Sequence, residues 1–175
     1  MEDLRYPIGK FERPKNPDDA LRIKLIAQIA EAPAAVRAAV RGLTDVQLNT
    51  PYRPGGWTVR QVVHHLPDSH MNAYVRLKLT LTEQQPTIKP YNEAKWAELA
   101  DASNEPIEVS LVLLESLHKR WVTCWNSLKG ADFSLTMKHP ERGLMDLDAL
   151  LGLYAWHGRH HAAHITSLRE REGWK

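Results

Sequence analysis

Residues 147–168 decide the fold of this chain, and they read LDALLGLYAWHGRHHAAHITSL. Apolar or small residues recur in this stretch at intervals of three, four and seven. An α-helix has 3.6 residues per turn, so this spacing places them along one helical face. The stretch therefore predicts a long helix, beginning near Asp146, that buries one face against other helices. The face is formed by Leu147, Leu151, Tyr154, Gly158, Ile165 and Leu168.

Three earlier segments carry a similar helical pattern, at about residues 18–42, 58–81 and 107–128. The first contains Pro33, which predicts one bent helix or two collinear ones. The second begins with a capping box, Thr58-Val-Arg-Gln61, and contains Pro67, where we expect a local bend. The third ends at Lys129-Gly130, a typical helix stop. The chain thus has four principal helices.

The connections between these helices complete the prediction of the fold. Residues 84–106 are rich in proline, asparagine and charge, and predict a long connection with one helical turn near Trp96. Residues 133–145 predict a turn or a short hairpin. Four helices with one long connection, between the second and third, indicate an all-α four-helix bundle. At 175 residues, we expect a single domain covering residues 1–175.

Charge and hydropathy exclude several classes of protein. The 23 basic and 21 acidic residues are interleaved and form no basic stripe. We therefore expect no nucleic-acid partner. No stretch approaches the roughly 18 apolar residues that span a bilayer, and the N-terminus lacks the apolar core of a signal peptide. A single cysteine, Cys124, fits a reducing compartment. We therefore expect a cytoplasmic protein with no membrane partner.

Four of the nine histidines lie in the last predicted helix. At roughly 100° per residue, His161 falls at the centre of the apolar face and His157 about 40° to one side. His160 lies about 100° away and is expected to face outward or toward a helix boundary, and His164 is intermediate at about 60°. Both His157/His161 and His160/His164 have the four-residue spacing that lets two imidazoles converge on one ion. The first pair is favoured because it lies nearer the core.

A third ligand should come from the second helix. His64 and His65 both flank its apolar face, and periodicity does not decide between them. His70 lies on that face, where it could be a ligand, a partner that orients a ligand, or a packing residue, the last being favoured. Buried imidazoles cost free energy unless both nitrogens are paired, and a metal ion pairs one nitrogen of each. The histidines therefore predict a metal site.

The sequence resembles the YfiT branch of the DinB superfamily of metal-dependent hydrolases, which is related to bacillithiol S-transferases. The resemblance extends over nearly the whole chain. It is carried by residues 6–9, 50–53, 55–66, 68–72, 152–154, 156–157, 160–161, 163–166 and 173–174. The family pattern places one ligand histidine before a leucine in the second helix and an H-x-x-x-H pair in the fourth. The resemblance thus implies His65, His157 and His161 as ligands, in a bundle of the DinB/YfiT type.

Three neutral imidazoles with open coordination positions suit one Zn²⁺ or Ni²⁺ per chain. The first functional hypothesis is a hydrolase in which the ion activates water toward a small-molecule substrate. The alternatives are a metal-dependent, bacillithiol-type thiol S-transferase and a non-catalytic, metal-binding dimeric bundle. Because ligation requires neutral imidazole, metal affinity is expected to fall below about pH 6.5.

Other residues receive candidate roles around this centre. Asp68 and His70 are candidate catalytic residues that would orient the ligands or relay protons. Arg60 and Arg76 could receive an anionic substrate, although both also suit a solvated helix position. Six tryptophans and many leucines exceed what one thin bundle easily buries, and the resemblance to the DinB/YfiT family also implies association. We therefore expect a homodimer.

Overall fold

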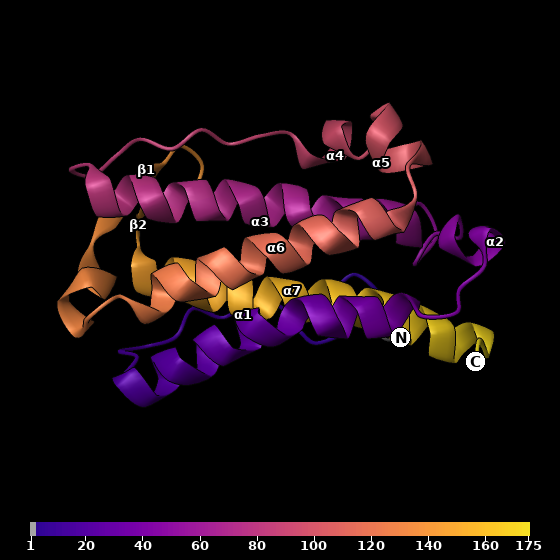
Figure 1. Ribbon diagram of the computed structural model, residues 1–175, viewed down its shortest axis with the longest axis horizontal. Coiled ribbons are helices and arrows are strands. Elements are labelled where there is room, and N and C mark those ends of the chain that lie inside the picture. Colours follow the sequence, from indigo (N-terminus) through magenta and orange to yellow (C-terminus); the bar gives the residue numbers. More distant parts are fainter. Residues whose placement is uncertain (1–2) are drawn as a thin grey trace.

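The computed structural model describes residues 3–175, and four long helices dominate this part of the chain (Figure 1). The predicted all-α four-helix bundle, with its long connection between the second and third main helices, is confirmed. No helix among the described residues is long and apolar enough to cross a membrane. The long helices are α1 (Asp19–Val40), α3 (Val59–Thr82), α6 (Ile107–Asn126) and α7 (Leu147–Glu172).

Shorter elements form the connections. The hairpin predicted within residues 133–145 is present as two antiparallel strands, and the helical turn near Trp96 is α4. Three short helices, α2, α5 and the 3-10 helix η1, were not predicted, although the N-cap of α2, Thr44, forms a capping box of the same type as that of α3. The short elements are α2 (Asp45–Leu48), α4 (Glu93–Trp96), α5 (Ala100–Asn104), the 3-10 helix η1 (Gly130–Ser134), β1 (Thr136–His139) and β2 (Gly143–Asp146).

Two prolines lie inside long helices without dividing them. Pro33 is within α1 and Pro67 within α3, and each helix is continuous on both sides of its proline. The division of the first helix that the sequence allowed does not occur. Both prolines are buried, and packing of the apolar faces outweighs the loss of one backbone hydrogen bond at each.

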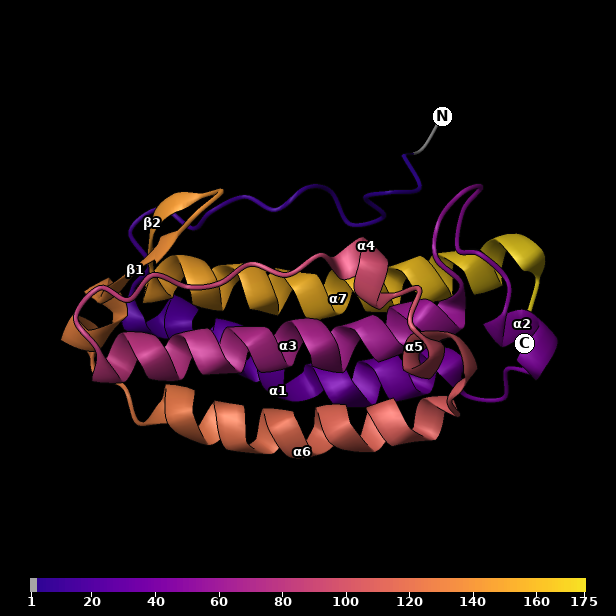
Figure 2. The same cartoon turned by 90° about the horizontal axis from the view of Figure 1, so that it is seen from above.

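The helices are arranged so that α1 and α3 occupy opposite corners of the bundle, since each packs against both α6 and α7. Figure 1 shows the connection after α3 returning along the length of that helix, so α3 and α6 run parallel to each other. Helices α1 and α7 run in the opposite direction. The segment before α1 lies extended along α7 (Figure 2), where the Trp156 Nε1 donates to the Gly9 carbonyl at 3.2 Å.

The core consists of two apolar clusters with a layer of histidines between them. On α6, Leu114 belongs to one cluster and Trp121 to the other, and His118 lies between these two residues. On α7, His157 and His161 lie between Ala155 of one cluster and Ala162 of the other. The middle of the bundle is therefore polar, and both ends are apolar.

Candidate metal centre

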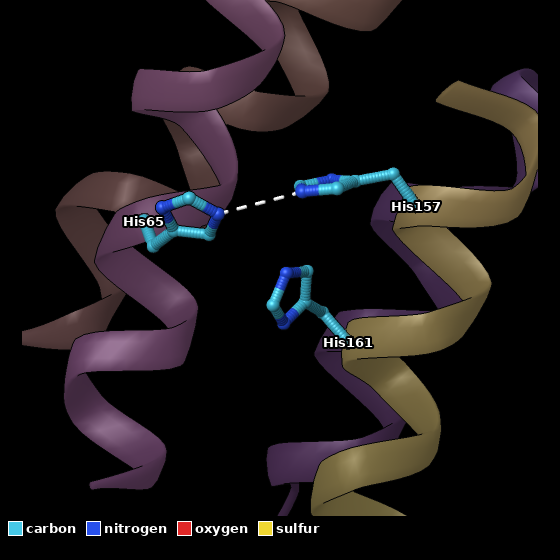
Figure 3. A group of neighbouring side chains, drawn as sticks. All are labelled: His65, His157 and His161. Carbon is cyan, nitrogen blue, oxygen red and sulfur yellow. Dashed lines mark hydrogen bonds between the residues drawn. The ribbon is translucent and has the colours of Figure 1, made fainter. Parts of the chain in front are cut away.

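Three imidazoles from two helices converge between α3 and α7 (Figure 3). His65 comes from α3, and His157 and His161 come from α7. One ring nitrogen from each lies within 4.8 Å of those of the other two. The Nε2 atoms of His65 and His157 are 3.4 Å apart. The structure thus brings together the three residues that the sequence and the resemblance singled out.

This geometry fits a divalent ion. A tetrahedral ion with metal–nitrogen bonds of about 2.05 Å holds two ligand nitrogens about 3.3 Å apart. The observed 3.4 Å between the Nε2 atoms of His65 and His157 is close to that value, and it is long for a direct hydrogen bond. The donor set, three imidazoles and no thiolate, is also one that Zn²⁺ and Ni²⁺ accept.

The local structure of α3 explains why His65, and not His64, faces the centre. The Thr58 Oγ1 accepts from the Gln61 backbone N–H at 3.2 Å, and this cap fixes where the helix begins. His64 instead points toward α6. Its Nε2 donates to the Glu105 carbonyl at 3.0 Å, and its Nδ1 accepts from the Ser110 hydroxyl at 2.7 Å. Both nitrogens of His64 are therefore satisfied away from the centre.

Burial keeps the three converging imidazoles neutral. It lowers the pKa of His65 to about 4. Burial, together with the neighbouring imidazoles, holds the pKa values of His157 and His161 well below their ordinary value of 6.5. A neutral imidazole offers a lone pair, whereas a protonated one repels a cation. The site is therefore prepared for a metal ion at neutral pH.

The candidate catalytic residues Asp68 and His70 are placed differently. His70 is fully buried, and its Nε2 lies 3.0 Å from the Nδ1 of His157, so it contacts a candidate ligand rather than only filling the core. Asp68 is half-buried, and burial together with Asp101 raises its pKa to about 6. Among residues 3–175, its carboxylate makes no hydrogen bond to an imidazole. The structure does not bring Asp68 to the centre.

His160 is buried, so of its two expected positions the outward one was wrong. The segment before α1 covers this side of α7, which helical periodicity within α7 does not reveal. The His160 ring stacks on Trp156 at a centroid distance of 4.1 Å and lies 6.0 Å from the ring of Tyr6.

His118 is a buried residue that sequence reasoning missed. Its Nε2 lies 2.6 Å from the Nδ1 of His70, and its Nδ1 donates to the Ile29 carbonyl at 2.7 Å. The signal was available, because His118 follows Leu114 by four residues and precedes Trp121 by three. That spacing places it on the buried face of α6.

The three imidazoles line a cavity of about 330 Å³, which is in the range of small-molecule sites. Its walls combine aromatic and aliphatic side chains with five histidines and four charged side chains. Arg76 of α3 also lines it. The remaining lining residues are Trp57, Ser69, Pro90, Tyr91, Glu93, Met137, His139, Glu141, Arg142, Met145, Leu150, Leu153, Tyr154, Trp156 and His160.

A four-helix bundle with three convergent imidazoles in the wall of such a cavity defines a class of metal-binding helical protein. The chain belongs to the DinB superfamily, whose family model matches residues 28–165. A protein of Bacillus mycoides (strain KBAB4), named "Putative metal-dependent hydrolase", is 58% identical over 174 residues, which are 99% of this chain and 100% of the relative. A protein of the same name from Bacillus cereus (strain 03BB102) is also 58% identical, with the same coverage.

The fold also matches a solved structure. YfiT from Bacillus subtilis, described as a probable metal-dependent hydrolase with an unusual four-helix bundle topology, superposes with a TM-score of 0.96. The two sequences are 47% identical, and the match covers 98% of this chain and 99% of the other. The resemblance inferred from sequence motifs is thereby confirmed.

Proposed function

We propose that the protein is a metal-dependent hydrolase in which His65, His157 and His161 hold one divalent ion, Zn²⁺ or Ni²⁺. The convergence of three neutral imidazoles in the wall of a cavity carries the proposal. Three protein ligands are typical of catalytic sites, because they leave a coordination position open. The bound ion would supply Lewis acidity and lower the pKa of water toward neutrality. The names of the relatives support this function.

The residues around the centre would bind a small-molecule substrate and limit the access of water. Trp57 packs against His65 at a centroid distance of 4.7 Å, and its ring is stacked at 6.5 Å from that of His161. Trp156 and Tyr154 add further aromatic surface to the wall of the cavity. Such walls favour an apolar portion of the substrate next to the ligands.

Arg76 is a candidate contact for an anionic group on that substrate. It lines the cavity and forms no ion pair among residues 3–175, and its buried Nε has no hydrogen-bond partner. Arg60, the other arginine considered from the sequence, has a structural role instead. It donates to Asp45 and to the Glu105 carbonyl, each at 2.9 Å.

A substrate screen with metal-loaded and chelated protein tests this function. We expect turnover of ester or amide substrates that is lost on chelation, restored by Zn²⁺ or Ni²⁺, and absent from His65→Ala. Pairs of a low-molecular-weight thiol and an electrophile belong in the same screen. Metal-dependent conjugation without hydrolysis would replace this proposal with an S-transferase. Bound metal without any turnover would indicate a non-catalytic bundle.

A further inference from the structure

We infer that two chains of hydrogen-bonded groups, each ending on a backbone carbonyl, fix the tautomers of His157 and His161. Each of these imidazoles then carries its proton on Nδ1 and keeps the Nε2 lone pair for the ion. The carbonyl at the end of each chain fixes which atom donates and which accepts at every link, because a carbonyl oxygen only accepts hydrogen bonds.

The first chain starts at the carbonyl of Ile29. The His118 Nδ1 lies 2.7 Å from this oxygen and must donate to it. In a neutral His118, the Nε2 is then an acceptor, so the His70 Nδ1, 2.6 Å away, donates to it. The Nε2 of His70 accepts in turn from the Nδ1 of His157 at 3.0 Å. His157 is left with a lone pair on Nε2, the atom that lies 3.4 Å from the Nε2 of His65.

The second chain is shorter and starts in the segment before α1. The His164 Nε2 lies 3.1 Å from the carbonyl of Arg5 and donates to it. The Nδ1 of a neutral His164 therefore accepts, and the Nδ1 of His161, 3.3 Å away, donates. The Nε2 of His161 keeps its lone pair. Two unrelated backbone carbonyls thus impose the same tautomer on the two ligands of α7.

The assignment requires that the imidazoles of both chains are neutral, and burial provides this. His70 and His118 are buried to 0% and 2% exposure, and His164 to 3%. A positive charge on a buried imidazole without an anionic partner costs far more free energy than a neutral ring, so these three imidazoles are neutral. No water is needed to complete either chain, since every link is a direct contact.

These hydrogen bonds hold His157 and His161 in the tautomer that can bind the ion, so metal binding requires no change of tautomer. An imidazole with its proton on Nε2 cannot ligate through that atom, and turning the ring would break its hydrogen bond. His70, His118 and His164 are therefore positioning residues for the ligands. Removing such partners of metal-bound histidines typically costs about 10–100-fold in metal affinity.

Variants of His118 test the first chain. His118→Phe keeps a planar ring but removes the acceptor for His70, so we expect weaker metal binding by about 10–100-fold. His118→Gln places an amide oxygen near the lost Nε2 and should keep affinity close to that of the unaltered protein. His64→Phe is the matched control, because it removes a buried, hydrogen-bonded histidine that is adjacent to His65 but outside both chains.

The second chain calls for a different conservative substitution. The acceptor on His164 is Nδ1, which the side-chain oxygen of asparagine approximates, so His164→Asn should retain affinity where His164→Phe loses it. Gln at position 118 and Asn at position 164 thus restore acceptors at different ring positions. A general loss of packing would not follow this pattern.

The decisive readout is the tautomeric state, measured by long-range ¹H–¹⁵N NMR of the imidazoles in metal-free protein. We expect the proton on Nδ1 of His157 and His161, and a change at His157 in His118→Phe. Zn²⁺ affinity, measured by chelator competition, is the second readout. A proton on Nε2 of either ligand in the unaltered protein would overturn the inference. So would equal losses of affinity in His118→Phe and His64→Phe.

The affinity readout rests on the proposed metal site, but the tautomer readout does not. The expected tautomers in a protein that fails to bind Zn²⁺ or Ni²⁺ would therefore contradict the proposed function alone. The reverse result, tight binding with the proton on Nε2 before metal is added, would contradict the hydrogen-bonded chains alone.

Discussion

Two neighbouring histidines of α7 have different surroundings although both are buried. His161 converges with His65 and His157, whereas His160 stacks on Trp156. Replacing His65, His157 or His161 by Ala should therefore reduce the metal content from one ion per chain to a small fraction. His160→Ala is the matched control and should retain the ion. Elemental analysis of the four purified variants is the measurement, and unchanged metal in all three ligand variants would refute the assignment.

His118 should also make stability depend on pH. Its pKa in the folded protein is about 4, whereas an unfolded chain protonates histidine near pH 6.5. Between these values the unfolded state binds more protons, so the free energy of unfolding falls as the pH drops. The contribution of His118 to the free energy of unfolding is fully present above pH 6.5 and is lost toward pH 4. The loss is about 1.4 kcal/mol per pH unit for each histidine of this kind.

Urea denaturation of metal-free protein at several pH values between 7 and 4 checks this prediction. His118→Gln, which does not titrate, should show a slope smaller by about one proton than the unaltered protein. An identical slope in both proteins would mean that His118 is already protonated in the folded state.

At the scale of the elements, the close approach of α1 and α7 determines where the α7 ligands lie. A Cβ on Gly158 would be 2.8 Å from the Cβ of Ala32 on α1 and 3.6 Å from Cε1 of His70. Gly158→Ala should therefore push the helices apart, destabilise the protein by about 1–3 kcal/mol and weaken metal binding. Gly130→Ala is the control, because its new Cβ meets nothing nearer than 3.9 Å. Denaturation and Zn²⁺ titration of both variants provide the measurement, and equal effects would exclude this explanation.

At the scale of the whole molecule, the two apolar clusters on either side of the histidine layer should hold the bundle together without metal. Chelation is expected to preserve the helical circular dichroism and to lower the melting temperature. Unfolding on chelation would show instead that the ion is required for the fold.

Bound metal should stabilise the protein down to a lower pH than the ordinary pKa of histidine suggests. Since burial lowers the pKa of His65 to about 4, protons compete with the ion only well below pH 6.5. The difference in melting temperature between metal-loaded and chelated protein should therefore stay nearly constant from pH 8 to about 5, and shrink below it. Calorimetry tests this, and a decline that is already complete at pH 6 would contradict it.

Association between chains remains a proposal. Trp121 and Trp125 are fully buried within one chain, so the number of tryptophans argues less for a dimer than the sequence suggested. An apolar strip on α6 is better support, because Val109, Val112 and Leu113 are 58%, 49% and 42% exposed. Light scattering should give twice the mass of the chain, and Leu113→Glu should reduce it to one chain. A single-chain mass for the unaltered protein would exclude the dimer.

The sequence by itself determined the four helices, their approximate bounds and the pair His157 and His161. These features depend on contacts within a few residues, such as helical periodicity, capping boxes and prolines, and such contacts can be counted along the chain. The choice of His65 over His64 required the family resemblance, because both flank the same helical face. The structure gives the physical reason, which is that His64 is turned to Ser110 and Glu105.

Only the tertiary structure decided which groups meet across helices. His118 on α6 contacts His70 on α3, 48 positions earlier, and the carbonyl of Ile29 on α1, 89 positions earlier. Likewise, His160 is buried because a segment about 150 residues earlier covers it, and Asp68 is not among the residues that line the cavity. Periodicity identifies the buried face of a helix. It does not identify the partner, because that depends on how separate elements pack in space.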